Sequence, residues 1–397
     1  MPSRKKNFNL PVFKDEVELT GFLEDSFTES LKQLIRVTVK LMIKEEMKNF
    51  REEMYQLVGP SFNGHYNRKM IGPFGTVEDI PVPRFRNNPD DFQPKTLGVF
   101  DQQQDKFFGL VAEMHRLGIS QRKVKHIVKA CLGTNISTNR VGTIHRQLAE
   151  VEEANINSTT LTDEFEYLLV DGLWTKTKGY GWEDSKSVLL CVLGIKPDGE
   201  RKIIGFRVAR SESYQDWHQL LLSIKQRGLQ GRNLKLIISD DSEGLTKAVD
   251  QLFPQTPLQN CIVHKLRNVI GKTSYKNRKE VAADAKQVYQ QETKEESLTT
   301  VKAFCKKWYL KEPKAVNSFK HNFLRTITYY DFEKKLWTKI RTTNILEREF
   351  REVRRRIKVF DSSFNSIDSH TRYAGSIINH LNQNYPAVKN PNLHTNS

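Results

Sequence analysis

Short apolar runs alternate with helical periodicity between about residue 163 and residue 264, and this order constrains the fold more than any other feature. Three strands are expected first, over Phe165–Asp171, Val188–Leu193 and Lys202–Val208, because each run is short, apolar and bounded by turn-forming residues. Lys196–Gly199 joins the second and third runs and has the composition of a hairpin turn. The region therefore begins with an antiparallel meander.

Two helices and two further strands are expected next. Ser213 is placed to cap a helix that Gly228 ends, and Leu245–Phe253 carries apolar residues at helical spacing. Leu234–Ile238 predicts a buried strand between these helices, and a short run to Cys261–His264 predicts a fifth strand. The order β-β-β-α-β-α-β predicts a mixed α/β fold with the layout of an RNase H-like core.

Three acids stand at the ends of expected elements. Asp171 closes the first strand run, Asp240 closes the fourth, and Glu347 lies far downstream in a helical pattern. Strand ends are rigid and can direct carboxylates into a cleft, and carboxylate oxygens are ligands for Mg²⁺. The chain has 63 basic and 47 acidic residues, a net charge of +16 that attracts nucleic acid. Together these features predict two-metal phosphoryl-transfer chemistry on a nucleic acid, with the three acids as catalytic metal ligands.

Two of these assignments have local alternatives. Asp241 is adjacent to Asp240 and could face the metal in its place, although the strand end favours Asp240. Asn344 and Glu347 also match a capping box, in which Glu347 would stabilise a helix start. The two roles of Glu347 are compatible, because one helix face is apolar and leaves Glu347 on another; that face carries Leu346, Phe350, Val353 and Ile357.

Composition excludes several classes of protein. No run approaches the roughly 20 apolar residues that span a bilayer, and no secretory signal is present. The cysteines, Cys131, Cys191, Cys261 and Cys305, are scattered, which fits a reducing cytosol. Cys261-x-x-His264 is half of a zinc site; the alternatives are a structural pair, or a His264 that contacts a phosphate or orients a carboxylate.

The N-terminal part predicts helices and one hairpin. A long helix is expected within residues 1–58, and a β-hairpin within 60–95, where Arg68, Arg84 and Arg86 either contact a DNA backbone or form a solvated edge. Three helices are expected over 101–152, with Ser120 capping and Gly133 ending the second. The second and third helices, joined by a turn, are typical of a helix-turn-helix, and the third carries Arg140 and Arg146. Any unit of three packed helices would give the same pattern.

The long interval before Glu347 predicts an insertion. It is 347 − 240 = 107 residues long, and its part from about 265 to 335 is helical and basic. Lys265 and Arg267 there are candidate DNA contacts, as are Arg351, Arg354 and Arg355 after the third acid. Trp308 in the insertion belongs either to a core or to a surface that stacks on a base.

Several motifs resemble one family in a single order, from about residue 60 to about 365. They are Asp171-Gly172, Ser239-Asp240 with Glu243-Gly244-Leu245, Cys261-x-x-His264 with Arg267-Asn268, and Arg341-Thr342-Thr343-Asn344-x-x-Glu347-Arg348. This set is similar to that of the transposases in the prokaryotic branch of the Mutator superfamily. The family usually has Asn three residues after the catalytic Glu, and Phe350 stands at that place here.

The resemblance implies a DDE enzyme with an RNase H-like core. Asp171, Asp240 and Glu347 would bind two Mg²⁺ ions, with Mn²⁺ as a substitute, and Cys261, His264 and Asn344 would lie at the active site. Its implied partners are double-stranded DNA, as terminal inverted repeats and as target, and a second copy in a homodimer. The family also suggests a circular intermediate and a place in the bacterial cytoplasm, on the nucleoid.

The patterns divide the chain into six parts. They are a helical and hairpin region (1–100), a helix-turn-helix-like region (101–160), a first core part (161–264), the helical insertion (265–335), a second core part (336–385) and a disordered tail (386–397). Two other functions remain open: a catalytically silent DNA-binding protein derived from a transposase, and an RNase H-like nuclease or resolvase. The intact acids argue against the first, and the large insertion and N-terminal region argue against the second.

Overall fold

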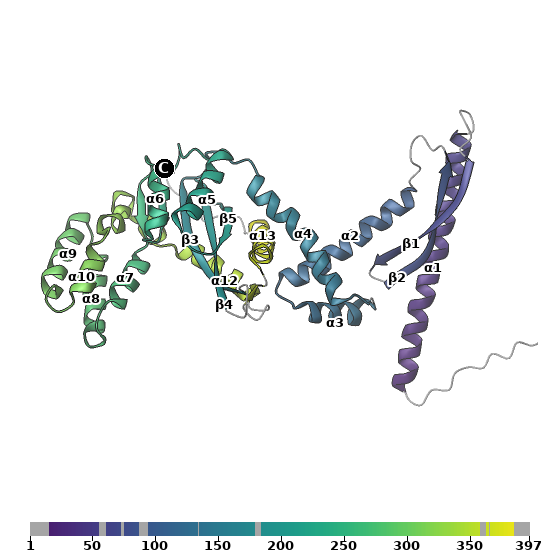
Figure 1. The fold of residues 1–397 in the computed structure, drawn as a ribbon, viewed down its shortest axis with the longest axis horizontal. Coiled ribbons are helices and arrows are strands. Elements are labelled where there is room, and N and C mark those ends of the chain that lie inside the picture. The colour runs from purple at the N-terminus through teal and green to yellow at the C-terminus, as the bar shows by residue number, and fades with distance from the viewer. Residues whose placement is uncertain are drawn as a thin grey trace, which may run out of the picture. The chain divides into compact units, whose positions relative to one another are not determined.

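The structure is a computed structural model that describes residues 16–54, 61–72, 75–86, 94–133, 135–178, 184–357, 363–364 and 366–384. The expected tail at 386–397 lies outside them. The chain is mixed α/β and divides into two compact units, residues 1–115 with 119–145 and residues 116–118 with 146–397 (Figure 1). No helix among the described residues is long and apolar enough to cross a membrane.

The first unit begins with a long helix packed on a hairpin. Strands β1 (Ser61–Gly72) and β2 (Gly75–Arg86) pair antiparallel, so the predicted hairpin is confirmed, and the predicted long helix is α1 (Glu16–Met54). Helix α1 contacts β2. Val39 and Ile43 of α1 are buried against the hairpin, in a cluster with Met70, Val77, Ile80, Val82 and Leu97. Burial of these apolar side chains supports a two-stranded sheet that would be marginal alone.

Three helices form the next core. Helix α2 (Lys95–Arg116) begins earlier than the sequence indicated, and α3 (Gln121–Leu132) and α4 (Thr138–Ser158) follow it. The Ser120 hydroxyl accepts the Lys123 N–H, and Gly133 adopts φ 62° at the end of α3, so both predicted boundary residues are confirmed. The helices share one buried cluster: Phe107, Val111, Ala112, Val124, Val128, Ile136, Val141 and Ile144.

The second unit is built on a mixed sheet in the order β5-β4-β3-β6-β7. Its elements are β3 (Tyr167–Lys178), β4 (Asp184–Ile195), β5 (Arg201–Ala209), α5 (Tyr214–Gln226), β6 (Leu236–Ser239), α6 (Glu243–Leu252) and β7 (Leu258–Asn260). The predicted β-β-β-α-β-α-β order is confirmed. The β3–β4 and β4–β5 pairs are antiparallel, whereas β6 pairs parallel with both β3 and β7. The fifth strand was placed too late: it ends at Asn260, and a helix begins at Ile262.

Alternate residues of β3 enter two different cores, as the period of a strand requires. Leu168 and Val170 pack with Trp217 and Leu221 of the α5–α6 layer. Leu169 and Leu173 pack with a layer that contains α12 (Asn344–Ile357) and α13 (Ile367–Asn384). Strand β8 (Ser363–Phe364) adds to β3 in parallel. The sheet is therefore covered on both faces.

The described chain between β7 and α12 contains helices joined by turns and no strand. It contains α7 (Ile262–Gly271), η1 (Tyr275–Asn277), α8 (Arg278–Val288), α9 (Lys294–Trp308), α10 (Pro313–Lys320), η2 (Phe323–Thr326), η3 (Thr328–Asp331), η4 (Lys334–Leu336) and α11 (Trp337–Ile340). Trp308 is 1% exposed, and its indole N–H donates to Asp284 over 2.8 Å. Trp308 is thus a core residue, and its alternative role in base stacking is wrong.

Candidate active site

Asp171 and Asp240 lie just beyond the last rung of a parallel strand pair. The apolar run suggested that Asp171 ends its strand. Strand β3 continues to Lys178, so Asp171 lies within the strand. However, β6 pairs only with Tyr167–Val170, and Val170 is opposite Ser239. Because the two strands run in the same direction, the residues that follow this rung, Asp171 and Asp240, are neighbours across the sheet.

Glu347 reaches the same place from the other layer. Asp171 shares the strand face of Leu169 and Leu173, which is the face that α12 covers. Leu346, Phe350 and Val353 of α12 are buried there and leave Glu347, in the first helical turn, half-buried at the layer's edge. The ligand atoms of Asp171, Glu347 and His264 all lie within 4.8 Å of one another.

The Glu347 carboxylate contacts two cations. Its Oε1 is 3.4 Å from His264 Nε2 and 3.5 Å from Arg267 Nη1. Helix α12 begins at Asn344 itself, which places Thr343 at the N-cap and moves the helix start one residue from the predicted capping box. Asn344 is exposed, and its N–H donates to Thr342 Oγ1 over 3.4 Å.

Phe350, the departure from the family pattern, is 2% exposed and packs in the core beneath the sheet. Its neighbours on the same helix face are Leu346 and Val353. The ring therefore anchors α12 and does not join the group of acids.

Cys261 and His264 lie where β7 gives way to α7. Cys261 precedes the first residue of α7 and is buried. The Cys261 thiol, followed by the Asp171 and Asp240 carboxylates, raises the pKa of His264 to about 9, against the effect of burial. Burial acts to raise the pKa of Cys261, yet contact with His264 outweighs it and leaves this pKa below its usual value. Cys261 is not part of the metal-ligand group, so the described geometry gives the zinc interpretation no second ligand pair.

The acids are crowded and poorly hydrated. Burial is the main cause that raises the pKa of Asp171 to about 7, and Asp240 and Glu347 add to it. His264 opposes this rise, as does the Gly172 N–H, which donates to Asp171 Oδ1 over 2.8 Å. Burial also raises the pKa of Asp240, against a 3.2 Å hydrogen bond from the Ser242 N–H. Carboxylate oxygens are the ligands that Mg²⁺ and Mn²⁺ prefer, so Asp171 and Glu347, whose ligand atoms lie within 4.8 Å of each other, fit such an ion, and Asp240 lies beside Asp171.

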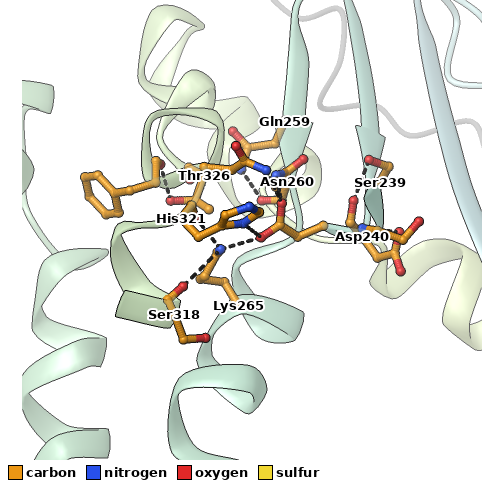
Figure 2. Close-up of polar contacts among 12 residues, drawn as sticks. Ser239, Asp240, Gln259, Asn260, Lys265, Ser318, His321 and Thr326 are labelled. Carbon is orange, nitrogen blue, oxygen red and sulfur yellow. Dashed lines mark hydrogen bonds and ion pairs between the residues drawn. The ribbon is translucent and has the colours of Figure 1, made fainter. Parts of the chain in front are cut away.

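Asp241 is held by other residues, on the side of the helical insertion. Its Oδ1 accepts Asn260 Nδ2 (2.8 Å) and Asn322 Nδ2 (2.9 Å), and its Oδ2 pairs with Lys265 Nζ. Figure 2 shows Lys265 between Ser318 and His321, and Asp240 directed away from them. The geometry therefore agrees with Asp240, and not Asp241, as the acid next to Asp171.

Lys265 is 1% exposed and bonded to Asp241, so its prediction as a DNA contact is corrected. It lies on the inner side of α7, whereas Arg267 is 60% exposed beside Glu347. Arg351, Arg354 and Arg355 are exposed on α12, and Arg355 pairs with Glu352 over 2.8 Å.

The other predicted DNA contacts vary in exposure. Arg68 pairs with Asp101 over 2.5 Å, and exposed Arg84 lies 5.0 Å from the ring centroid of Tyr66. Arg140 is half-buried over the ring of Phe108, and Arg146 is exposed. The side chain of Arg86 lies outside the described residues.

Glu212 is a nearby acid that the sequence did not indicate. It precedes the Ser213 cap of α5, where an acid looks like an ordinary solvated turn residue. Burial raises its pKa, Asp240 adds to the rise, and a hydrogen bond with Trp174 opposes it. A Cβ on Gly172 would lie 2.7 Å from Glu212 Oε1, so Gly172 leaves room for this carboxylate beside Asp171.

This chain is similar to known proteins over most of its length. The family described as "Transposase, Mutator family" matches residues 12–387. The transposase for insertion sequence element IS406 of Burkholderia multivorans is 31% identical over 82% of this chain and 83% of its own length. The transposase for IS256 in transposon Tn4001 of Staphylococcus aureus is 28% identical over 93% and 94%. The transposase for IS1201 of Lactobacillus helveticus is 26% identical over 87% and 93%.

Proposed function

Because the chain belongs to the Mutator family of transposases, we propose that it cuts and joins DNA at a divalent-metal site formed by Asp171, Asp240 and Glu347. One observation supports this most: ligand atoms of Asp171 and Glu347 lie within 4.8 Å of each other although the two residues are 347 − 171 = 176 positions apart, and Asp240 follows the strand rung next to Asp171. The strand order and the helices on both faces support an RNase H-like core.

The three acids would hold two Mg²⁺ ions, or Mn²⁺ in their place. The chemistry that such ions supply when bound is activation of water or a DNA 3′-hydroxyl and stabilisation of the leaving oxygen. The chain contributes the rigid arrangement: β3 and β6 fix the two aspartates relative to each other, and the buried face of α12 fixes Glu347.

His264 and Arg267 would attract the DNA phosphate to these acids. Contact with Cys261 and the nearby carboxylates raises the pKa of His264, and the exposed Arg267 guanidinium lies 3.5 Å from Glu347 Oε1. Charged donors beside the acids would both bind a scissile phosphate and offset the charge that develops on it.

DNA binding would involve both units. We propose that the helix-turn-helix-like region with Arg140 and Arg146, and the hairpin with Arg68, Arg84 and Arg86, contact the terminal inverted repeats. Arg351, Arg354 and Arg355 would contact the DNA backbone near the acids. A homodimer, target DNA, a circular intermediate and a place on the bacterial nucleoid complete the proposal. The division into six parts that the sequence predicts remains part of the proposal, with α7 of the insertion starting at Ile262.

A nicking assay on labelled duplexes that carry an element end tests the proposal. With Mg²⁺, the wild-type protein should cut the DNA at the element end and join the freed 3′-hydroxyl to a phosphate of another strand, while Asp171→Asn should bind the same duplex without cutting it. Asp198→Asn is the matched control, because it removes an acid at a remote turn and Asn can keep the 2.8 Å bond to the Glu200 N–H. Binding without cutting by the wild type would favour the silent DNA-binding protein, and cutting without joining would favour the nuclease.

A further inference from the structure

Helix α1 carries apolar side chains on two opposite faces. Val39 and Ile43 face the hairpin and are buried. Leu23, Phe27, Leu34, Val37 and Leu41 are 53–71% exposed. At 3.6 residues per turn, Leu34 and Leu41 lie about 220° and about 200° round the helix axis from Val39, measured in the same direction. These five residues, the α1 seam, therefore run along the side away from the hairpin.

The seam has the period of a coiled coil. Its members follow one another at steps of 4, 7, 3 and 4 residues, which fit a heptad with Phe27, Leu34 and Leu41 at a and Leu23 and Val37 at d; Ser30 occupies the d position between these two. A helix that lies on a globular core repeats at 3.6 residues, whereas this 3.5-residue repeat matches a second helix wound around the first. The partner is therefore a helix with the same repeat, and a second copy of α1 supplies one.

The flanking charges favour a parallel pair. In a parallel coiled coil the residue at g faces the residue at e of the partner's next heptad. Here Lys40 is at g, and Glu45, five residues later, is at e, so opposite charges would meet on both sides of the seam. Glu45 has an exposed neighbour, Lys48, at 3.7 Å, which is too weak a contact to prevent this pairing.

We propose that α1 of one chain pairs in parallel with α1 of a second copy along the α1 seam. The hairpin stays on the outer side of each helix, so pairing leaves the buried face of α1 intact. The inference rests on the homodimer in the proposed function and assigns its interface to the α1 seam. It is independent of the metal chemistry, because it stands on the pattern of α1 alone.

Sedimentation of the full chain without DNA or metal tests the seam. The wild type should be a dimer, and Leu34→Glu/Leu41→Glu should be a monomer with unchanged helix content by circular dichroism. Met42→Glu, a half-exposed apolar position of α1 outside the seam, should remain dimeric. A monomeric wild type, or a dimeric double variant, would overturn the proposal.

A charge exchange tests the parallel orientation. Lys40→Glu should weaken the dimer by about 10-fold, because repulsion replaces attraction at both flanks. Lys40→Glu/Glu45→Lys should restore the wild-type dissociation constant. An antiparallel pair would not bring these two positions together, so a double variant that stays as weak as Lys40→Glu rules out the parallel seam.

A second observation, the buried network around Asp241, carries a separate inference. The side chains of Asp241 and Lys265 are 6% and 2% exposed, and Lys265 Nζ also donates to the His321 carbonyl over 2.6 Å. Asn260, at the end of β7, and Asn322, at the start of η2, donate to the same carboxylate. The network thus joins two strand ends to the helical insertion, as Figure 2 shows for Asn260, Lys265 and His321.

We infer that Asp241 is a positioning residue for Asp240. The two are adjacent in the chain, so a carboxylate held by three donor groups leaves the Asp240 backbone little freedom. A buried ion pair is weak evidence of added stability, but it selects one arrangement of the groups around it. The inference rests on the proposed function, since it assigns Asp240 to a metal site.

Mn²⁺ binding without DNA, followed by calorimetry, tests this role apart from activity. Asp241→Asn/Lys265→Gln removes both charges and keeps polar groups, and it should bind Mn²⁺ about 10-fold more weakly than the wild type. Arg116→Met/Glu152→Gln, which neutralises another largely buried pair with a 2.6 Å contact, should bind Mn²⁺ normally. Equal affinity in the wild type and the Asp241 variant overturns this inference alone. Absence of Mn²⁺ binding by the wild type overturns the proposed metal site as well.

Discussion

Val170 and Ser239 are opposite each other as the last parallel pair of β3 and β6, and an acid follows each of them directly. This register explains why Asp171 and Asp240 are neighbours although 69 residues separate them (240 − 171). Parallel strands run in the same direction, so the residue after Val170 and the residue after Ser239 lie side by side. The side chain of Asp171 then faces the layer that supplies Glu347.

Glu347→Gln separates the catalytic role of this residue from a capping role. Because α12 begins at Asn344, Glu347 lies one residue past the capping-box position, and Gln would also serve in such a box, so the variant should keep its helix content and its melting temperature. Loss of the charge at the metal site should lower nicking by at least about 100-fold. Circular dichroism and the element-end nicking assay measure the two effects. A destabilised variant that cuts DNA normally would show that Glu347 stabilises the start of α12 and has no catalytic role.

Gly172→Ala should act through Glu212. The added methyl group would lie 2.7 Å from Glu212 Oε1 and 3.0 Å from Val188 Cγ2. We expect a loss of about 1 kcal/mol in the free energy of unfolding, because the Glu212 side chain can move aside at a moderate cost. In a Glu212→Ala background the same change should cost much less. Urea unfolding of the wild type, the two single variants and the double variant gives the coupling energy between positions 172 and 212. If the losses in the free energy of unfolding simply add, the contact is contradicted.

The sequence predicted the elements that carry the acids more accurately than the tertiary contacts around them. Periodicity and turn residues indicated the strand and helix order, because both signals are local. The length of β3 was missed, since Trp174 and the alternating Lys and Thr residues after Asp171 do not form an apolar run. Lys265 appeared to be a DNA contact because a partner such as Asp241, 24 residues away, cannot be read from local sequence. Glu212 was missed for the same reason.

Stability should fall in mild acid because of His370. Its Nδ1 lies 2.9 Å from Ser187 Oγ, its ring stacks on Phe364 with centroids 4.3 Å apart, and burial lowers its pKa to about 4. In the unfolded chain the pKa is about 6.5, so below that pH the unfolded state takes up a proton that the native state does not. The stability present above about pH 6.5 is therefore lost progressively as the pH falls towards 4. Between about pH 7.5 and about pH 5 the loss should be about 2 kcal/mol.

Urea unfolding of the wild type and of His370→Gln at both pH values isolates this contribution. The variant is expected to be less stable at the higher pH, because the packing on Phe364 changes, but it should lack the pH-dependent loss that His370 causes. If the free energy of unfolding depends on pH equally in the two proteins, the proton is taken up by a group other than His370.

Phe350→Asn restores the residue that the family usually has at this place, and we expect it to harm this chain. Phe350 is buried between α12 and the sheet, so removing its ring leaves a cavity and adds a buried amide. The free energy of unfolding should fall by about 3–5 kcal/mol, and nicking should fall because α12 no longer holds Glu347. Phe350→Leu, which keeps an apolar side chain, should lose less than about 1.5 kcal/mol and retain most of its activity. Unfolding curves and nicking rates measured together decide the point, since a stable and more active Phe350→Asn protein would show that the site accepts the family's amide and that Phe350 is not the anchor of this helix.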